Sequence, residues 1–460
     1  MRSKMKKTSQ QGRREFMRRL LGGVLLLPGG AGLSLLGMPG RTLAAPGDAG
    51  DYRALVCLYL HGGNDSFNML VPTAPAAHAR YRRTRGNLAI PRESLLPIQP
   101  AHAQALEYGF HPSLEPLHRY FVEGDLAVVA NLGTLLEPVT REQARRNPER
   151  LPAQLFSHSD QTFQWQTANP GSLDPLGWGG RMADLMQSMN GEALLPMNIT
   201  LAGESLFLTG RKVVQYALDP EGPEALEMLN DDPVAGALMR LFEIRRAHLL
   251  QRQFARVQRR SIELQGLVSG VLETEAPLET PFPDSGLGRQ LAMVARMIAA
   301  RERFGIGKGR QLFLVAKGGW DTHDRQNQDQ PQLLADLAAS MSAFQQAMVE
   351  SGSAGSVTLF TASEFGRTLT SNGDGTDHGW GGHQMVLGGA VRGGDIYGEI
   401  PEMVLDGEDD LGDGRIIPTL SADQYAATLA RWFGVPQSEL GQLFPQLARF
   451  ETDDLGFMGA

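Results

Sequence analysis

Histidines and carboxylates gather in four glycine-rich stretches of this sequence, residues 61–65, 317–323, 362–367 and 377–383. Imidazole and carboxylate groups together suit zinc, manganese or iron, and glycine lets the backbone come close to a bound ion. Any one of these residues alone is more often a loop cap or an ordinary hydrogen-bonding group. Their recurrence indicates a divalent-metal site, provided that the fold brings the stretches together.

Each of the four stretches borders an apolar run that has the character of a buried β-strand. Residues 55–60, 312–316 and 357–361 precede the first three stretches, and residues 385–387 follow the fourth. Such runs are typical of central parallel strands that are covered on both faces. Because ligands of these sheets gather at the carboxyl ends of the strands, we expect the loops to converge.

The rest of the chain alternates between strands and helices. This order predicts an α/β fold with a mostly parallel central sheet and helices on both faces. Prolines interrupt residues 73–110, so only short helices are expected there. Further strands are expected at 126–132, 197–208 and 384–389, and helices at 111–122, from Ser157 onward, and at 179–189, 287–303, 331–350 and 421–433.

A helical insertion is expected at about residues 210–285. Residues 233–272 have the apolar spacing of one long amphipathic helix, with arginines on its other face. The simpler interpretation is a solvated basic face, and the alternative is a surface for an anion or a partner. The proline-containing stretch 274–286 ends this insertion.

The first 45 residues have the order of an export signal. Arg13 and Arg14 precede an apolar run at 20–36, and small residues follow at 42–45. This order is typical of a cleavable twin-arginine signal, and an uncleaved anchoring helix is the alternative. We therefore expect residues 46–460 to form one domain in the periplasm or outside the cell, with no stable membrane span after cleavage.

The remaining chain is strongly acidic. The whole chain has a formal net charge of −8 and residues 1–45 carry a net +8, so residues 46–460 carry about −16. This charge makes the chain a poor candidate for non-specific binding to nucleic acid. Cys57 is the single cysteine, which excludes an internal disulfide. Its apolar surroundings predict a small buried side chain rather than a ligand.

Five motifs carry a resemblance to a known family: residues 62–65, 157–161, 318–323, 363–368 and 377–383. In this order they resemble the DUF1501 family of exported proteins, which is grouped with the alkaline-phosphatase and sulfatase superfamily. The resemblance covers nearly all of the chain after the signal and implies an alkaline-phosphatase-like fold. It also implies a site where carboxylates and histidines hold two divalent metals, and where a side chain at a helix start attacks phosphorus or sulfur.

The resemblance assigns roles to individual residues of this chain. Asp65 matches the first-strand carboxylate, and Asp321 with His323 matches the middle metal pair. Ser157 matches the nucleophile at a helix start, and Ser159 is the next candidate. Both serines are equally well explained as helix caps. A Ser-His-Asp mechanism with His158 is disfavoured, because adjacent residues at a helix start do not normally face each other.

The later motifs match the superfamily in two ways. In one alignment Asp377 and His378 form the metal-binding pair, and His383 closes the site. In the other, Glu364 takes the acidic position at a strand end, and His378 or His383 closes the site. The second alignment places Phe365 where the superfamily has a histidine. One of the two metal positions would then lack an imidazole, which leaves a one-metal enzyme, an altered site or no catalyst.

The sequence also offers groups for an anionic substrate. Lys317 and Arg367 are expected to clamp it, unless they are ordinary surface charges, and Asn64 is expected to orient a substrate oxygen or brace Asp65. No Cys-x-Pro-x-Arg element is present in the sequence, which disfavours sulfatase chemistry.

Two functions therefore compete at the level of sequence. The first is an exported hydrolase of phosphate or related esters that uses zinc or manganese and acts on a small anionic substrate. The second is a non-catalytic periplasmic protein that keeps the fold in order to bind a ligand or to assemble with another exported protein. A redox protein has little support, because the chain has no haem-attachment motif.

Overall fold

The computed structural model describes residues 52–459, except for residues 103, 170–173, 224–231 and 245–247. The export signal expected at residues 1–45 lies outside the described residues. Among the described helices, none combines the length and the apolar character needed to cross a membrane.

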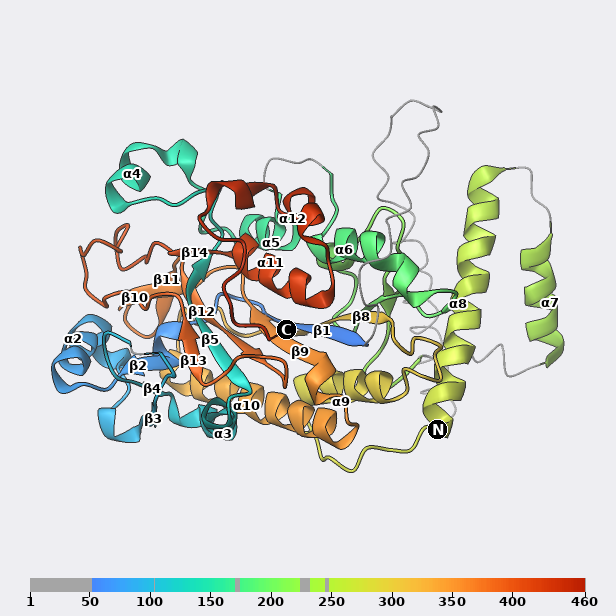
Figure 1. Cartoon of the computed structure of the whole chain (residues 1–460), viewed down its shortest axis with the longest axis horizontal. Helices are drawn as coiled ribbons and strands as arrows, with labels where there is room; N and C mark the ends of the chain where they lie inside the picture. The colour runs from blue at the N-terminus through green and yellow to red at the C-terminus, as the bar shows by residue number, and fades with distance from the viewer. Residues whose placement is uncertain (1–51, 103, 170–173, 224–231, 245–247, 460) are drawn as a thin grey trace, which may run out of the picture. The chain divides into compact units, whose positions relative to one another are not determined.

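Nine strands of the described chain form the central sheet. They are β1 (Arg53–Leu60), β5 (Leu126–Gly133), β6 (Asn198–Thr200), β7 (Tyr216–Ala217), β8 (Arg310–Lys317), β9 (Val357–Ala362), β12 (Gly382–Leu387), β13 (Asp395–Tyr397) and β14 (Leu420–Ser421). Their order is β13-β5-β12-β9-β1-β8-β6-β7, with β14 beside β5 (Figure 1). All pairings described for this sheet are parallel except those of β12, which is antiparallel to β5 and β9. The expected α/β class with a mostly parallel sheet is confirmed.

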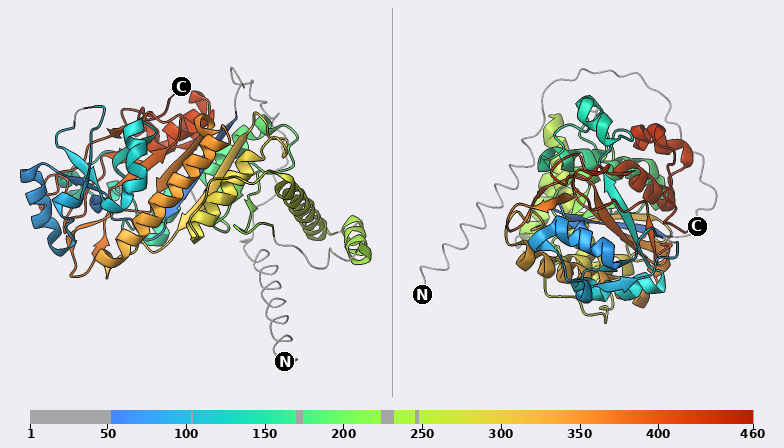
Figure 2. Two further views of the ribbon diagram at one scale, coloured as in Figure 1. Left: turned by 90° about the horizontal axis from the view of Figure 1, so that it is seen from below. Right: turned by 90° about the vertical axis from the view of Figure 1, so that its left-hand side faces the viewer.

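Helices cover both faces of this sheet, as the views in Figure 2 show. Successive side chains of a strand point to opposite faces. In β1, Val56 and Leu58 belong to one hydrophobic core, and Leu55 and Cys57 belong to the other. The first core contains α3 (Glu115–Glu123), α9 (Gly286–Ala299) and α10 (Gln326–Glu350), and the second contains α5 (His158–Thr167), α6 (Trp178–Met186), α11 (Ala422–Phe433) and α12 (Gln437–Leu443).

Smaller elements surround the central sheet. Residues 73–110 were expected to hold only short helices, but this region also contributes strands to a three-stranded antiparallel sheet, β2-β4-β3. Strands of three residues are too short to show an alternating pattern, which explains the error. The smaller elements are β2 (Leu70–Pro72), α2 (Pro75–Arg85), β3 (Leu96–Ile98), β4 (Tyr108–Phe110), α4 (Arg141–Arg146) and the hairpin of β10 (Arg367–Ser371) and β11 (Thr376–His378).

The insertion contains two helices where one long helix was expected. They are α7 (Asp232–Glu243) and α8 (Leu249–Thr274). His248 caps α8, because its Nδ1 accepts the backbone N–H of Leu250 at 3.2 Å. A side chain that satisfies a free N–H marks the start of a new helix. The hydrophobic spacing continues across this start, so spacing alone could not locate it.

The motif-bearing loops lie at the edge of the sheet that is formed by the carboxyl ends of its parallel strands. Leu60 and Lys317 are paired at the ends of β1 and β8, and Ala362 at the end of β9 lies beside Tyr59. Because β12 is antiparallel to its neighbours, its first residue, Gly382, lies at this same edge. The loops after β1, β8 and β9 therefore meet the segment that leads into β12, as expected.

Candidate metal centre

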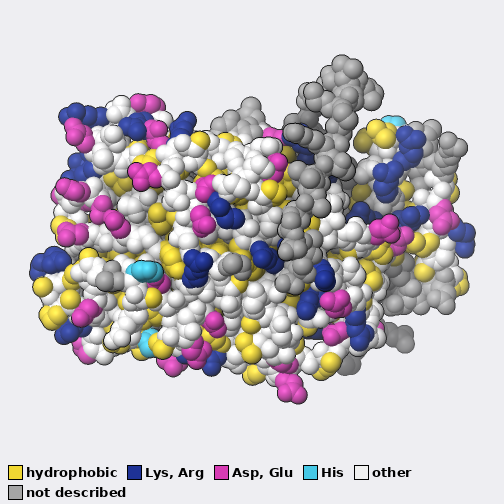
Figure 3. Space-filling model, in the orientation of Figure 1, with side chains coloured by type: hydrophobic (Ala, Val, Ile, Leu, Met, Phe, Trp, Pro, Cys, Tyr) yellow, Lys and Arg dark blue, Asp and Glu magenta, His cyan; other side chains and the backbone are white. Residues whose placement is uncertain are grey.

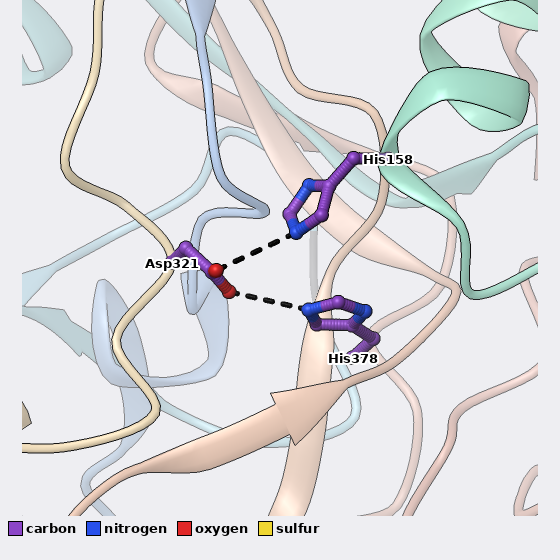
Figure 4. A group of neighbouring side chains, drawn as sticks. All are labelled: His158, Asp321 and His378. Atoms are coloured by element: carbon purple, nitrogen blue, oxygen red, sulfur yellow. Dashed lines mark hydrogen bonds and ion pairs between the residues drawn. The ribbon is translucent and has the colours of Figure 1, made fainter.

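Three side chains from distant parts of the chain meet at this edge. His158 begins α5, Asp321 lies in the loop after β8, and His378 ends β11 (Figure 4). One ligand atom from each lies within 4.8 Å of the other two. Nε2 of His378 lies 3.2 Å from Oδ1 of Asp321, and Nε2 of His158 lies 3.5 Å from Oδ2. Two imidazoles and one carboxylate are a donor set found in zinc sites.

His323 brings a third imidazole to the group. Its Nε2 lies 3.1 Å from Oδ1 of Asp321 and 2.9 Å from Nε2 of His378. The four side chains of His158, Asp321, His323 and His378 are between 21% and 44% exposed. A small molecule can therefore reach these groups from solvent.

Each of the three imidazoles is held through its other ring nitrogen, Nδ1, by an acceptor. The acceptors of His158, His323 and His378 are, in turn, Oε1 of Glu364 at 2.9 Å, Oδ1 of Asp377 at 3.1 Å and the backbone O of Phe156 at 2.7 Å. Ionised carboxylates and carbonyl groups only accept hydrogen bonds, so Nδ1 carries the proton in each neutral ring. Nε2 of each ring therefore presents a lone pair.

These lone pairs meet without a donor between them. Nε2 of His323 and Nε2 of His378 are 2.9 Å apart, and the Asp321 carboxylate lies beside both. Such a contact is unfavourable unless a proton or a cation is shared among the groups. Outer hydrogen bonds to Nδ1 are also the means by which metal sites fix the orientation of their histidines. The nitrogen and oxygen donors fit zinc or manganese.

Local charges keep the carboxylates ionised. Burial raises the pKa of Asp321, but the hydrogen bond and charge of Arg367, with the neighbouring histidines, hold it below its usual value. A hydrogen bond from Asn372 lowers the pKa of Asp377. Burial lowers the pKa of His378, which favours the neutral ring that a metal requires.

Arg367 binds Asp321 from the interior of the protein. Its side chain is fully buried, and its Nη1 donates to Oδ1 of Asp321 at 2.7 Å and to the backbone O of Gly62 at 3.2 Å. The expected role of Arg367 as a substrate clamp has no support in this geometry, because the guanidinium is engaged with the protein. The guanidinium instead fixes the position of Asp321.

Phe365 packs against two of the three histidines of the cluster. Its ring centroid lies 4.9 Å from that of His158 and 4.7 Å from that of His378. In the second of the two alignments, Phe365 stands where the superfamily has a ligating histidine. His158, from the first turn of α5, brings an imidazole to the same neighbourhood, so the cluster has an imidazole that neither alignment supplies.

Asp65 and His383, two of the expected metal ligands, are engaged elsewhere. Asp65 is fully buried in an ion pair with Arg85 and also accepts a hydrogen bond from Gln326. His383 is 2% exposed, and its Nδ1 accepts the backbone N–H of Asn131 at 3.0 Å. Neither residue belongs to the group formed by His158, Asp321 and His378.

Asn64 and Lys317, two expected substrate-binding residues, have partners inside the protein. Asn64 is buried, and the Nδ2 of its side chain donates to Sδ of Met69 at 2.8 Å. The ammonium group of Lys317 forms an ion pair with Asp336 at 2.5 Å. The described contacts therefore do not place either side chain in the cluster.

Ser157 and Ser159 lie at the start of α5, next to the cluster. Ser157 caps this helix, and its Oγ donates to Oδ2 of Asp160 at 2.5 Å. Oγ of Ser159 lies 3.1 Å from Oγ of Ser157. Ser157 follows Phe156, whose carbonyl holds His378, and precedes His158. The cap and the nucleophile interpretations therefore both remain compatible with its position.

His158 is the site residue that sequence reasoning missed. The sequence relates His158 only to its neighbour Ser157, whereas its contacts with Glu364 and Asp321 join parts of the chain that are far apart in sequence. The motif at 157–161 was the available signal. It lies at a helix start, and the first side chains of a helix that starts at the edge where the motif-bearing loops meet can reach those loops.

Comparisons with known proteins extend these observations. No curated protein matches the chain. One similar solved structure is described as "Crystal structure of Ps i-CgsB in complex with k-i-k-neocarrahexaose", with 10% identity, a TM-score of 0.34 and coverage of 87% of this chain and 77% of that one. Another is the PsFucS1 sulfatase from Pseudoalteromonas sp., with 10% identity, a TM-score of 0.31 and coverage of 84% and 68%. At these TM-scores the likeness carries no conclusion about this chain. Residues 52–411 match the family described as "Protein of unknown function (DUF1501)", and the chain therefore belongs to the DUF1501 family.

Proposed function

We propose that this protein is an exported, metal-dependent hydrolase of phosphate or related esters. The observation that carries the proposal is the convergence of three Nε2 atoms, from His158, His323 and His378, on the carboxylate of Asp321. Each ring is oriented by an outer acceptor on Nδ1, which is how proteins prepare histidines for a metal.

His158, Asp321 and His378 would hold the ion, and His323 is placed to join them. Zinc and manganese both accept this donor set. When bound, such an ion lowers the pKa of a nucleophile and neutralises charge on an anionic ester. Glu364 and Asp377 keep the proton of their histidines on Nδ1, so that Nε2 stays available.

The start of α5 supplies the remaining groups that ester hydrolysis needs. Backbone N–H groups at a helix start bind anions, and this helix begins with His158 of the cluster. Oδ2 of Asp160 accepts the proton of Ser157 Oγ, so Asp160 is placed to take that proton when Ser157 attacks phosphorus. The P–O bond to the alcohol would break as the new bond forms, the alcohol would leave, and water would then hydrolyse the phosphoserine to release phosphate and restore Ser157. Ser157 is therefore the proposed nucleophile, with Asp160 as its base.

The test is metal content measured together with turnover. Protein purified without chelator should contain divalent metal by elemental mass spectrometry, and it should hydrolyse bis(4-nitrophenyl) phosphate or 4-nitrophenyl phosphate. His158→Gln and His378→Gln should lose both the metal and the activity. His102→Gln, at a histidine whose side chain is 83% exposed, is the matched control and should keep both.

The proposal fails if the wild-type protein stays metal-free after equimolar zinc or manganese is added, with no change in its melting temperature. Metal that binds without turnover of either ester would instead favour the non-catalytic alternative. These two failures are distinguishable, because the first removes the site and the second removes only its chemistry.

A further inference from the structure

Arg415 contacts two segments of the chain that build the metal centre. It lies in the loop between β13 and β14, and its Nε donates to the backbone O of His378 at 3.3 Å. The central carbon of its guanidinium group lies 4.8 Å from the ring centroid of Phe156. Phe156 directly precedes the cap of α5 and lies two residues before His158. One side chain therefore joins the start of α5 to the end of β11.

These two contacts lie on either side of the hydrogen bond that orients His378. Nδ1 of His378 donates to the backbone O of Phe156 at 2.7 Å. Phe156 lies in a turn, where no regular ladder of backbone hydrogen bonds fixes the direction of its carbonyl group. A guanidinium group over a phenylalanine ring is attracted to the face of that ring. Arg415 therefore holds the residue that donates this hydrogen bond and the residue that accepts it.

The backbone around Arg415 is itself firmly held. Its N–H donates to the backbone O of Gly412 at 3.0 Å, and its O accepts the N–H of Leu411 at 2.9 Å. The next residue, Ile416, is fully buried, and its O accepts the N–H of Gly381 at 2.8 Å. A side chain can fix the position of its partners only from a rigid base, and this loop supplies one.

An arginine beside a metal centre could instead bind the anionic substrate, but the surroundings of Arg415 disfavour that role. Its Nη1 forms an ion pair with Asp413 at 2.7 Å, and its side chain is 27% exposed. Figure 3 shows acidic side chains gathered at the left of the molecule, where the loop between β13 and β14 lies in Figure 1. A guanidinium group that is already neutralised adds little attraction for a further anion.

We propose that Arg415 is a positioning residue, which fixes His378 against the start of α5 and so prepares the site for metal. The metal part of this inference rests on the proposed function. Nε2 of His378 and Nε2 of His158 lie 3.2 and 3.5 Å from the two oxygens of Asp321. A turn of the His378 ring would move its Nε2 away from that carboxylate. Partners that orient a ligating histidine typically change metal affinity roughly 10- to 100-fold.

The first test measures zinc affinity of the full chain by chelator competition. Arg415→Met removes the charge and the donor but keeps an extended side chain, and the affinity should fall on the order of 10-fold. Arg415→Lys should recover only part of this loss, because an ammonium group lacks the planar shape that stacks on a ring. The matched control is Arg141→Met. The Arg141 side chain is 23% exposed and pairs with Asp406 of the same loop, so its loss should leave zinc affinity unchanged.

A double-mutant cycle tests whether Arg415 acts through Phe156. Phe156→Leu alone should also weaken zinc binding, and Arg415→Met should weaken it less in that background than in the wild type, because both changes remove the same contact. Fully additive losses would overturn this route. A raised KM for the ester with unchanged zinc affinity in Arg415→Met would overturn the proposal and assign the residue to substrate binding. Circular dichroism and the melting temperature should show that each variant is folded.

The second test needs no metal, so it separates this inference from the proposed function. In the metal-free protein, the Nδ1 proton of His378 should give a downfield proton NMR signal that His378→Gln removes. This proton should exchange with water faster in Arg415→Met and should be unaffected in Arg141→Met. A wild type that binds no zinc would refute the proposed function alone. Unchanged exchange in Arg415→Met would overturn the positioning role, whether or not the wild type binds zinc.

Discussion

The substitution His383→Asn should make the stability of this protein less sensitive to acid. His383 lies in β12, and its Nδ1 accepts the backbone N–H of Asn131 at 3.0 Å. Because the ring is buried, and burial penalises its charged form, the pKa of His383 is lowered from 6.5 to about 4. Asparagine keeps an oxygen acceptor near the position of Nδ1 and does not titrate.

The sign and the size of the effect follow from this pKa. A histidine whose pKa is lower in the folded state contributes its full stability above pH 6.5 and loses it as the pH falls toward 4. One pKa unit corresponds to about 1.4 kcal/mol, so at pH 5 the loss through His383 reaches about 2 kcal/mol relative to pH 7.5. Burial also lowers the pKa of His111 to about 4, and this residue contributes equally to both proteins. Its contribution cancels in the comparison.

The assay is urea unfolding followed by tryptophan fluorescence at pH 7.5 and at pH 5, with chelator present so that release of metal does not contribute. The free energy of unfolding should fall by about 2 kcal/mol more in the wild type than in His383→Asn. Equal falls, within about 0.5 kcal/mol, would refute a buried neutral ring. The variant should also keep the metal content of the wild type, since loss of metal would return His383 to the set of ligands.

Three further substitutions test the site and its support. Glu364→Gln keeps an acceptor for Nδ1 of His158 but removes the charge, so metal affinity measured by chelator competition should fall on the order of 10-fold, and an unchanged affinity would contradict the outer role. Ser157→Ala should abolish ester turnover and cost about 1 kcal/mol through the lost cap, whereas retained turnover would leave only the cap. Arg85→Gln should cost roughly 3–5 kcal/mol of unfolding free energy, because it leaves the Asp65 carboxylate buried and unpaired, and partial recovery on adding Asp65→Asn would verify that cause.

Much of the fold could be predicted from the pattern of hydrophobic residues in the sequence. An unbroken apolar run predicted a strand at 55–60, and β1 occupies Arg53–Leu60 with nearly all of its side chains buried. The parallel class followed from such runs, which are covered on both faces. The three-residue strands β2, β3 and β4 could not be predicted, because their pairing depends on tertiary contacts rather than on local periodicity.

The candidate site was predictable only where its residues follow or precede a strand directly. Asp321 and His323 come shortly after β8, and His378 lies shortly before β12. His158 follows a long connection after β5, so no spacing related it to the same edge. Its role depends on tertiary contacts, among them the 2.9 Å contact between its Nδ1 and Glu364.

The same contacts bear on how many ions the site can hold. The resemblance implies two metals, one of them beside the first-strand carboxylate, but Asp65 is already neutralised by the buried guanidinium of Arg85. A second ion there would have to share a fully buried space with that positive charge, which low local dielectric makes very costly. Asp321 is different, because it faces three imidazole lone pairs as well as Arg367. We therefore expect elemental analysis to give about one divalent ion per chain, whereas two equivalents in the wild type would show that an ion can displace Arg85 from Asp65.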